Sequence, residues 1–191
     1  MKLGKTLYVT NRKAWRAWLA KHHRSAKEIW LVYYRQEIGK PRLSYNAAVE
    51  EALCYGWIDS IIKKVDKERF AQRFSPRKKT SVLSQMNKER IKNLIAQKKM
   101  TKAGLAAVAH VFDHTKKDGR FVIPPVILKA LRADKQAWAN FRKFPASYKR
   151  IRVAYLASQR RHGAEQYQKA LKHFVKMTAR NKRFGFVREM I

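Results

Sequence analysis

The spacing of hydrophobic residues changes at Pro76, and this change limits the folds that the chain can adopt. Before Pro76, three segments have the aromatic and β-branched character of strands, at residues 28–35, 57–65 and 69–75. After Pro76, apolar residues recur every three to four positions, which is the period of an α-helix. The sequence therefore predicts an α+β protein with a small antiparallel sheet of about three strands, flanked by helices and followed by a helical C-terminal half.

Turn and cap residues place the boundaries of these elements. The connection at residues 66–68 is too short for a crossover, so the strands on either side of it must be antiparallel. A first helix is predicted over residues 11–23, and a second begins after Ser44, a good N-cap, and ends before Gly56. We divide the chain into a sheet-containing part, a helical part packed on it and a basic tail, at residues 1–80, 81–180 and 181–191.

Charge is the second strong feature of the sequence. The chain has 45 Lys and Arg but only 13 Asp and Glu, so 32 positive charges remain even if every acid is paired. This excess opposes compaction through self-repulsion, which a polyanionic partner or bound counterions would relieve. The charge therefore indicates nucleic acid or another polyanion as the partner, with an anionic membrane surface less favoured. The alternative is a general surface bias without a specific ligand.

The sequence shows neither a disulfide framework nor a membrane segment. Its one cysteine, Cys54, fits a reducing compartment. Basic residues at Arg12, Lys13 and Arg16 interrupt the chain before an apolar signal-peptide segment is formed. No stretch approaches about 18 uncharged apolar residues. We therefore expect a cytoplasmic protein without a transmembrane segment.

Two blocks of sequence are distinctive. The first reads Glu-Glu-Ala-Leu-Cys-Tyr-Gly-Trp-Ile-Asp-Ser at residues 50–60, and the second reads Arg-Phe-Ser-Pro-Arg-Lys-Lys at residues 73–79. The pattern continues at Ser81, Ser84, Asn87, Ala103-Gly104-Leu105 and Pro124-Pro125. Together these residues resemble the bacterial family called bacteriocin-protection, YdeI or OmpD-associated. The resemblance implies a role in tolerance of antimicrobial peptides or of envelope stress.

The loop after Pro76 is the first candidate site. Arg and Lys side chains, together with hydroxyls ahead of a helix N-terminus, are groups that bind phosphate. Exposed basic loops are also common on so basic a chain, so the alternative interpretation is ordinary solvated surface. The candidate anion-binding residues are Arg73, Arg77, Lys78, Lys79, Ser81, Ser84 and Asn87.

A second candidate site surrounds Asp59. In an alternating strand, Trp57, Asp59 and Ile61 share one face, so the carboxylate is partly desolvated and requires a cation or several donors. Arg73 or Arg77 is positioned in the sequence to supply that cation. The arrangement is either a structural tie between the hairpin and the following loop or a ligand pocket formed by Trp57 and Asp59.

Metal and covalent chemistry have weaker signals. Cys54 is predicted in the last turn of a helix, whose dipole disfavours a thiolate, so we expect a buried and inert cysteine. His110 and His114 are four residues apart, but no third ligand is evident, and we predict no metal site. Without a glycine-rich phosphate loop or another cofactor motif, we expect no cofactor.

These observations leave three functions open. The first is a non-catalytic basic protein that binds an anionic polymer such as nucleic acid. The second, which the family resemblance implies, is stress or bacteriocin protection through a protein or a membrane-surface partner. The third is a small-molecule enzyme with its site around Trp57, Asp59 and Arg77, although no catalytic motif supports it.

Overall fold

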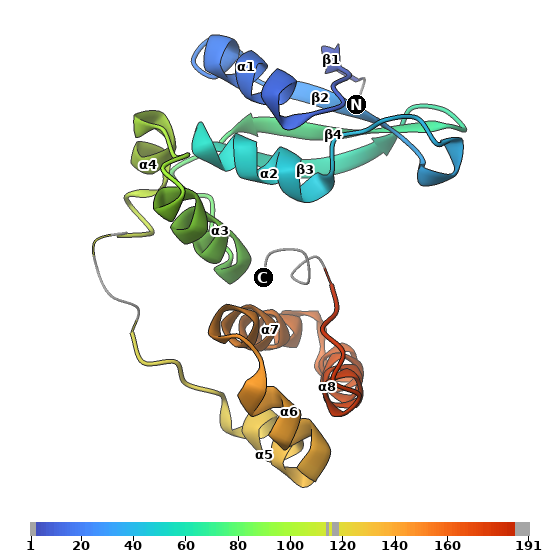
Figure 1. Ribbon diagram of the computed structural model, residues 1–191, viewed down its shortest axis with the longest axis vertical. Coiled ribbons are helices and arrows are strands. Elements are labelled where there is room, and N and C mark those ends of the chain that lie inside the picture. Colours follow the sequence, from blue (N-terminus) through green and yellow to red (C-terminus); the bar gives the residue numbers. More distant parts are fainter. Residues whose placement is uncertain (1–2, 114, 116–118, 186–191) are drawn as a thin grey trace. The chain divides into compact units, whose positions relative to one another are not determined.

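The computed structural model describes residues 3–113, 115 and 119–185. The chain divides into two compact units. The first unit comprises residues 1–83 and 90–114, and the second comprises residues 84–89 and 115–191. Strands and helices make up the first unit, and helices make up the described part of the second (Figure 1). The predicted α+β class is confirmed.

The strands of the first unit form one sheet in the order β1-β2-β4-β3. The elements of this unit are β1 (Thr6–Leu7), α1 (Arg12–His22), β2 (Ile29–Tyr34), the 3-10 turn η1 (Gln36–Ile38), α2 (Tyr45–Cys54), β3 (Trp57–Lys64), β4 (Arg69–Pro76) and α4 (Lys102–Val108). Helix α3 (Gln85–Ala96) is divided, with the residues from Arg90 onward in the first unit and the earlier ones in the second. The three predicted strands are present, and β4 is antiparallel to both β2 and β3. The addition is β1, which pairs parallel to β2 and makes the sheet four-stranded and mixed. With two residues, β1 is too short to give a periodic signal.

Side-chain caps explain where the helices begin. The side chain of Asn11 accepts a hydrogen bond from the N–H of Ala14 at 2.9 Å, and Ser44 accepts one from Ala47 at 3.2 Å. Both caps satisfy backbone donors that have no partner inside the helix. After α2 the chain reverses at Gly56, whose φ of +75° lies in the left-handed region that favours glycine. The predicted cap and stop of the second helix are confirmed.

A β-bulge in β3 changes the alternation of its side chains. Asp59 pairs with Phe74, but it is Ile62 rather than Ile61 that pairs with Gln72, so β3 has one extra residue in this interval. Ile62 thus continues the face of Asp59. The expectation that Ile61 shares this face is wrong, because strict alternation holds only in a regular strand.

Helices α1 and α2 pack against each other and cover one face of the sheet (Figure 1). The fully buried Trp15 of α1 donates from Nε1 to the carbonyl of Ala48 at 3.0 Å and meets the Phe74 ring edge-on at 5.5 Å. In the same layer, the 3%-exposed carboxylate of Glu51 accepts from Arg12 Nε at 2.9 Å and Arg16 Nη1 at 2.8 Å. A buried ring and a buried glutamate paired with two partly exposed arginines therefore hold α1 to α2.

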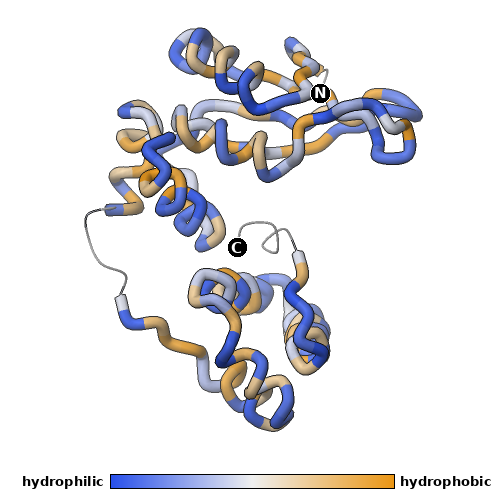
Figure 2. The backbone as a smooth tube through the Cα atoms, in the orientation of Figure 1, coloured by the Kyte–Doolittle hydropathy of each residue, from blue (hydrophilic) through white to orange (hydrophobic). Residues whose placement is uncertain are grey.

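The second unit is a helical group with its own core. Its elements are α5 (Pro125–Ala133), α6 (Lys135–Lys143), α7 (Ala146–Gln159), the 3-10 turn η2 (Arg160–His162) and α8 (Ala164–Ala179). Phe141, Tyr148 and Phe174 are almost fully buried in this core, and each helix also carries hydrophilic residues (Figure 2). Asn140 Nδ2 donates to two carbonyls at the end of α8, each at 3.0 Å, which joins α6 to α8. Among the described residues, no helix is long and apolar enough to cross a membrane.

The close approach of α4 to the end of α2 gives the first prediction. A Cβ added at Gly104 would lie 2.2 Å from the carbonyl oxygen of Cys54. Gly104→Ala should therefore lower the free energy of unfolding by about 1–3 kcal/mol, although alanine favours a helix over glycine by about 1 kcal/mol. Urea unfolding followed by tryptophan fluorescence measures the change. Gly119→Ala is the matched control, because its Cβ would meet nothing within 4 Å; equal midpoints for the two variants would contradict the prediction.

Candidate functional site

Asp59 lies on the helix-covered face of the sheet, and two side chains donate to its carboxylate. Oδ2 accepts from Tyr45 Oη at 3.1 Å and from Gln72 Nε2 at 2.9 Å. Tyr45 is the first residue of α2 and Gln72 belongs to β4, so the carboxylate connects a helix to the hairpin. Burial, with the charge of Asp59 adding to it, raises the pKa of Tyr45 to about 12. The tyrosine therefore remains a hydrogen-bond donor at neutral pH.

Two buried arginines interact electrostatically with this carboxylate. Arg77 is 9% exposed and Arg90 is 2% exposed. Burial lowers the pKa of Arg77, and the charge of Asp59 partly opposes this effect. Burial also lowers the pKa of Arg90, whose Nη2 donates to Asn46 Oδ1. The site thus combines two guanidinium groups and one carboxylate in a region with little water.

The second cation predicted for Asp59, Arg73, lies on the other face of the sheet. Its Nε donates to Glu28 Oε2 at 2.6 Å, and the same carboxylate accepts from Trp30 Nε1 at 3.0 Å. These hydrogen bonds, that from Arg73 above all, lower the pKa of Glu28. Successive residues of a strand point to opposite faces, which separates Arg73 from its neighbour Gln72. Of the two predicted cations, only Arg77 interacts with Asp59.

Arg77 is turned into the protein rather than toward solvent. Its backbone N–H donates to the carbonyl of Gly56 at 2.9 Å, which fixes the residue at the end of the hairpin. Its Nη1 donates to the carbonyls of Ser81 at 3.4 Å and Val82 at 3.2 Å. Its Nε and Nη2 are buried and have no hydrogen-bond partner in the described protein. The guanidinium thus contacts the backbone of the loop that follows β4 through one of its nitrogens.

The other loop candidates lie in different settings. Lys78 and Lys79 are exposed, and Ser81 is half-buried. Ser84 and Asn87 are grouped with the second unit, where Ser84 Oγ accepts from the N–H of Asn87 at 3.2 Å as the N-cap of α3. The role of these residues in anion binding stays a prediction.

Trp57, predicted to line a pocket with Asp59, is a core residue. It is 1% exposed, its Nε1 donates to the carbonyl of His23 at 3.2 Å, and its ring meets Trp18 edge-on at 5.7 Å. The residues that do surround Asp59 include Tyr45, which the sequence analysis missed along with Gln72 and Arg90. One signal was available: Gln72 stands between two phenylalanines on the apolar face of a strand, where a polar side chain requires a partner.

Cys54 and His110 have no part in this cluster. Cys54 is fully buried, and burial raises the pKa of its thiol. His110 lies in a turn after α4, and His114 lies outside the described residues. Within the described ranges, no group of three or more His, Cys, Asp or Glu side chains is placed to hold a metal ion.

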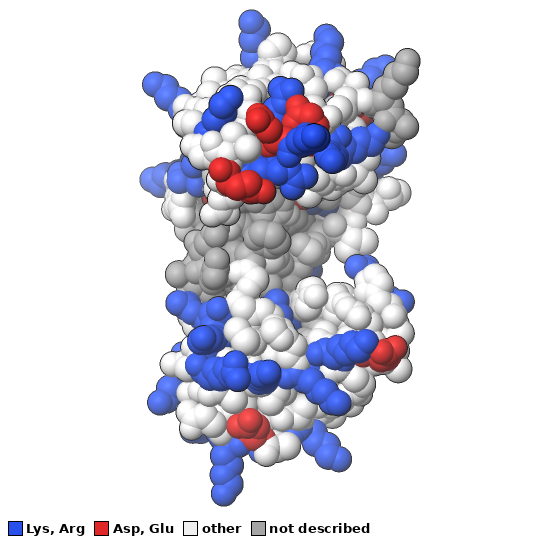
Figure 3. Space-filling view, turned by 90° about the vertical axis from the view of Figure 1, so that its right-hand side faces the viewer, with Lys and Arg blue, Asp and Glu red and all other residues white. Residues whose placement is uncertain are grey.

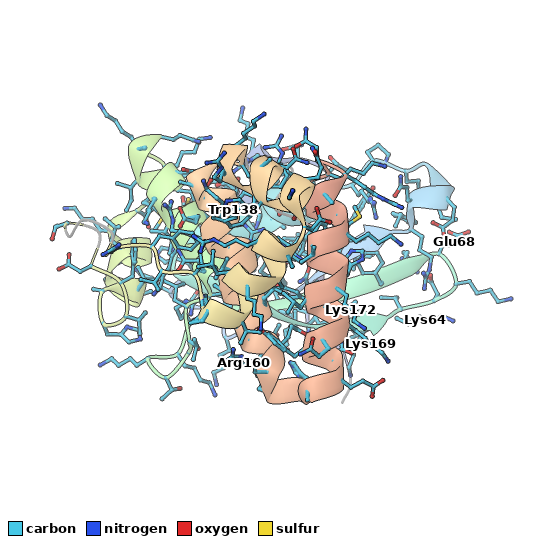
Figure 4. The ribbon with its side chains drawn as sticks, turned by 90° about the horizontal axis from the view of Figure 1, so that it is seen from below. Lys64, Glu68, Trp138, Arg160, Lys169 and Lys172 are labelled. Carbon is cyan, nitrogen blue, oxygen red and sulfur yellow. The ribbon has the colours of Figure 1, made fainter. Side chains whose placement is uncertain are left out.

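The second unit has a groove of about 520 Å³ between α5 and α8. Its lining residues are Ala130, Asp134, Gln168, Leu171, Lys172, Val175, Lys176, Ala179 and Arg180. Lys172, Lys176 and Arg180 follow one another at four-residue intervals, so the two lysines lie along one side of α8 and Arg180, the C-cap, follows them at its end. None of the three has an acidic partner within 4.0 Å among the described residues, whereas Lys169, one turn earlier, pairs with Glu165 at 2.6 Å. Figure 4 shows Lys169 and Lys172 on successive turns of α8.

Basic side chains also dominate the surface more widely. Residues 120–191 contain 18 Lys and Arg against 3 Asp and Glu. On the face drawn in Figure 3, blue side chains outnumber red ones on both units. Most of the ion pairs in the described chain join an acid to an arginine: Arg12 with Glu50 and Glu51, Arg16 with Glu51, Arg69 with Asp66, Arg73 with Glu28 and Arg150 with Glu89. Lys172 and Lys176 of α8 are left to face solvent.

Two family models match the chain. The first, described as domain of unknown function (DUF8412), matches residues 7–107, which are 101 of the 191 residues. The chain belongs to this family. Residues 120–181 match the family described as Bacteriocin-protection, YdeI or OmpD-Associated, which confirms the family predicted from the sequence. No curated protein and no solved structure matches the chain.

The two matched regions contain different features of the structure. The DUF8412 match contains Asp59, Arg77 and the two sequence blocks, at residues 50–60 and 73–79, on which the predicted family resemblance was based. The Bacteriocin-protection, YdeI or OmpD-Associated match contains α5 to α8, and with them the groove and its cations. The buried cluster and the basic groove thus belong to separate family regions of this chain.

Asp59 gives the second prediction. Asp59→Asn would remove the carboxylate that accepts from Tyr45 and Gln72 and would leave Arg77 without its nearby negative charge. The free energy of unfolding should fall by about 1–3 kcal/mol. Urea unfolding measures the loss, and Glu37→Gln, on the surface, serves as control. An unchanged midpoint for Asp59→Asn would show that the carboxylate is not a structural tie.

Proposed function

We propose that this chain is a non-catalytic protein that binds an anionic polymer, with nucleic acid as the polymer that its charge fits best. The observation that carries this proposal is the row of unpaired cations at Lys172, Lys176 and Arg180 along the groove of the second unit. Nucleic-acid affinity without sequence preference arises mainly from the release of counterions when Lys and Arg neutralise phosphates. The net charge of +32 supplies the long-range attraction that such binding requires.

The arrangement of α8 supports contact with a repeating anion. Residues four apart on a helix are separated by about 6 Å along its axis, so the three cations form a row of regularly spaced charges rather than a single point of charge. Their opposite side is anchored, because Leu171 and Phe174 are buried in the core of the unit. A fixed row of cations loses less side-chain and backbone freedom on binding than a mobile tail would.

Lysine and arginine at an open groove contact phosphates without reading bases. Phosphate contacts position a protein on nucleic acid but carry no sequence information. The groove lining contains no aromatic side chain on which a base would stack. We therefore propose binding that is sensitive to salt and largely insensitive to sequence.

Protection against bacteriocins is a second candidate function, and the family match at residues 120–181 favours it. The charge restricts its mechanism. A chain with 32 excess positive charges repels a cationic peptide, so direct capture of such a peptide is disfavoured. Protection would instead proceed through an anionic protein or an anionic membrane surface, to which basic residues are attracted. Binding to vesicles that contain anionic lipid, in the absence of binding to DNA, would favour this candidate.

The third prediction concerns the α8 cations. For duplex DNA, the logarithm of the binding constant should fall linearly with the logarithm of salt concentration. Replacing Lys172, Lys176 and Arg180 with glutamine should flatten this slope by about two to three units, since each phosphate contact contributes about 0.9. Fluorescence anisotropy on two unrelated duplexes, measured from low to physiological salt, gives the slopes. The loss should be similar on both duplexes.

A matched variant distinguishes a binding site on α8 from a general excess of positive charge over the whole surface. Lys13, Lys21 and Lys27 are exposed lysines of the first unit, and changing them to glutamine removes the same charge. The slope of this control should change by less than one unit if α8 holds the contacts. Equal slopes for the two triple variants would rule out α8 as the site. No binding by the parent protein at low salt would end the nucleic-acid proposal.

A further inference from the structure

We propose that Arg77 binds a small oxyanion, a carboxylate or phosphate group, on the inner side of the loop that follows β4. The inference concerns a buried group of the first unit and does not depend on polymer binding by the second unit. It rests on which donors of the guanidinium are used, on the charge balance around Asp59 and on the structure of the covering loop.

The unused donors of Arg77 are a matched pair. Nη1 is taken by the carbonyls of Ser81 and Val82, whereas Nε and Nη2 are buried without a hydrogen-bond partner in the described protein. Nε and Nη2 lie on the same edge of the planar guanidinium. Two parallel N–H donors on one edge are the geometry that binds both oxygens of a carboxylate or phosphate. The donors that remain are therefore the ones an oxyanion uses.

Arg77 shares its opposing carboxylate with a second buried arginine. Arg77 and Arg90 are both buried, and Asp59 interacts electrostatically with each of them. Its Oδ2 already accepts two hydrogen bonds, from Tyr45 and Gln72. Burying an incompletely compensated charge is costly. A bound anion would give the Arg77 guanidinium a negative charge of its own.

Two other acids, both on α2, are engaged with other arginines. Glu50 pairs with Arg12 at 2.7 Å, and Glu51 pairs with Arg12 and with Arg16 at 2.9 and 2.8 Å. The charge of Glu50 also acts on Arg90, whereas the carboxylate that acts on Arg77 is Asp59. A neutral donor or acceptor would satisfy the N–H groups but would leave the charge incompletely compensated. The charge balance therefore favours an anion over an uncharged ligand.

The loop over Arg77 provides a route for an anion. Two carbonyls of the loop accept hydrogen bonds from Nη1 at 3.4 and 3.2 Å. These distances are at the long end of the range for N–H donors, so the two hydrogen bonds hold the loop weakly. Lys78 and Lys79 are exposed on this loop and attract anions to it. The side chain of Val82 is 85% exposed and need not be uncovered when this part of the loop moves, while the buried Leu83 holds the end of the loop in the core.

The test uses the full chain and two probes, sodium phosphate and sodium acetate, with ionic strength held constant by sodium chloride. The melting temperature of the parent protein should rise along a saturation curve with at least one probe, because a ligand that binds the folded state stabilises it. Comparison of the probes distinguishes a phosphate site from a carboxylate site. Arg77→Lys keeps the charge but loses the paired donors, and its apparent affinity should be weaker by about tenfold or more.

The control is the double variant Lys78→Gln, Lys79→Gln, which removes exposed charge from the same loop. It should retain a saturation curve, with a smaller change in affinity than Arg77→Lys. Equal curves for the parent and Arg77→Lys, or a rise without saturation in all three proteins, would overturn the proposal. If Arg77→Lys does not fold, the parent decides: in ¹⁵N-labelled protein, the Nε–H signal of a buried arginine must shift saturably with phosphate or acetate. Absence of such a shift would equally overturn the proposal.

Discussion

The shortage of acids is the constraint on which this structure depends. A chain with 45 basic side chains has 13 carboxylates, so their positions decide which cations are held inside and which face solvent. Glu51 is almost completely buried and joins α1 to α2 through Arg12 and Arg16. Glu28 holds Arg73 on the opposite face of the sheet. Because arginine forms bidentate and directional pairs with carboxylates, arginines fill these paired positions and lysines dominate the exposed row on α8.

Much of the fold could be predicted from local sequence, because its signals are local. The alternation of Phe70, Gln72 and Phe74 predicts a half-buried strand, and the short connection before it requires an antiparallel hairpin. Ser44 and Gly56 mark the ends of a helix by hydrogen bonding and by backbone conformation. The β-bulge beside Asp59 could not be predicted, since it occurs at consecutive branched apolar residues that fit a regular strand equally well. Strand β1 could not be predicted either, because its pairing with β2 depends on tertiary contact alone.

The candidate site was only partly predictable, because burial depends on the fold. The sequence analysis identified Asp59 as a carboxylate in need of partners, and the structure supplies Tyr45 and Gln72. It could not identify Arg90, which lies 31 positions after Asp59 in the sequence and belongs to helix α3. Arg77 looked like a loop cation equivalent to Lys78, yet its guanidinium is buried and Lys78 is exposed. The spacing of residues in a sequence does not show in which direction a loop side chain points.

The two proposed anion-binding roles differ as a buried arginine differs from an exposed lysine. Charges on α8 face water, where added salt screens them within about 10 Å at 0.1 M ionic strength. Salt screens the Arg77 guanidinium much less, because the group is 9% exposed and its field acts in a region of low dielectric. Polymer binding through Lys172 and Lys176 should therefore disappear as salt is raised, while binding of a small oxyanion at Arg77 persists. Salt concentration thus separates the two roles in a single preparation of the protein, without any substitution.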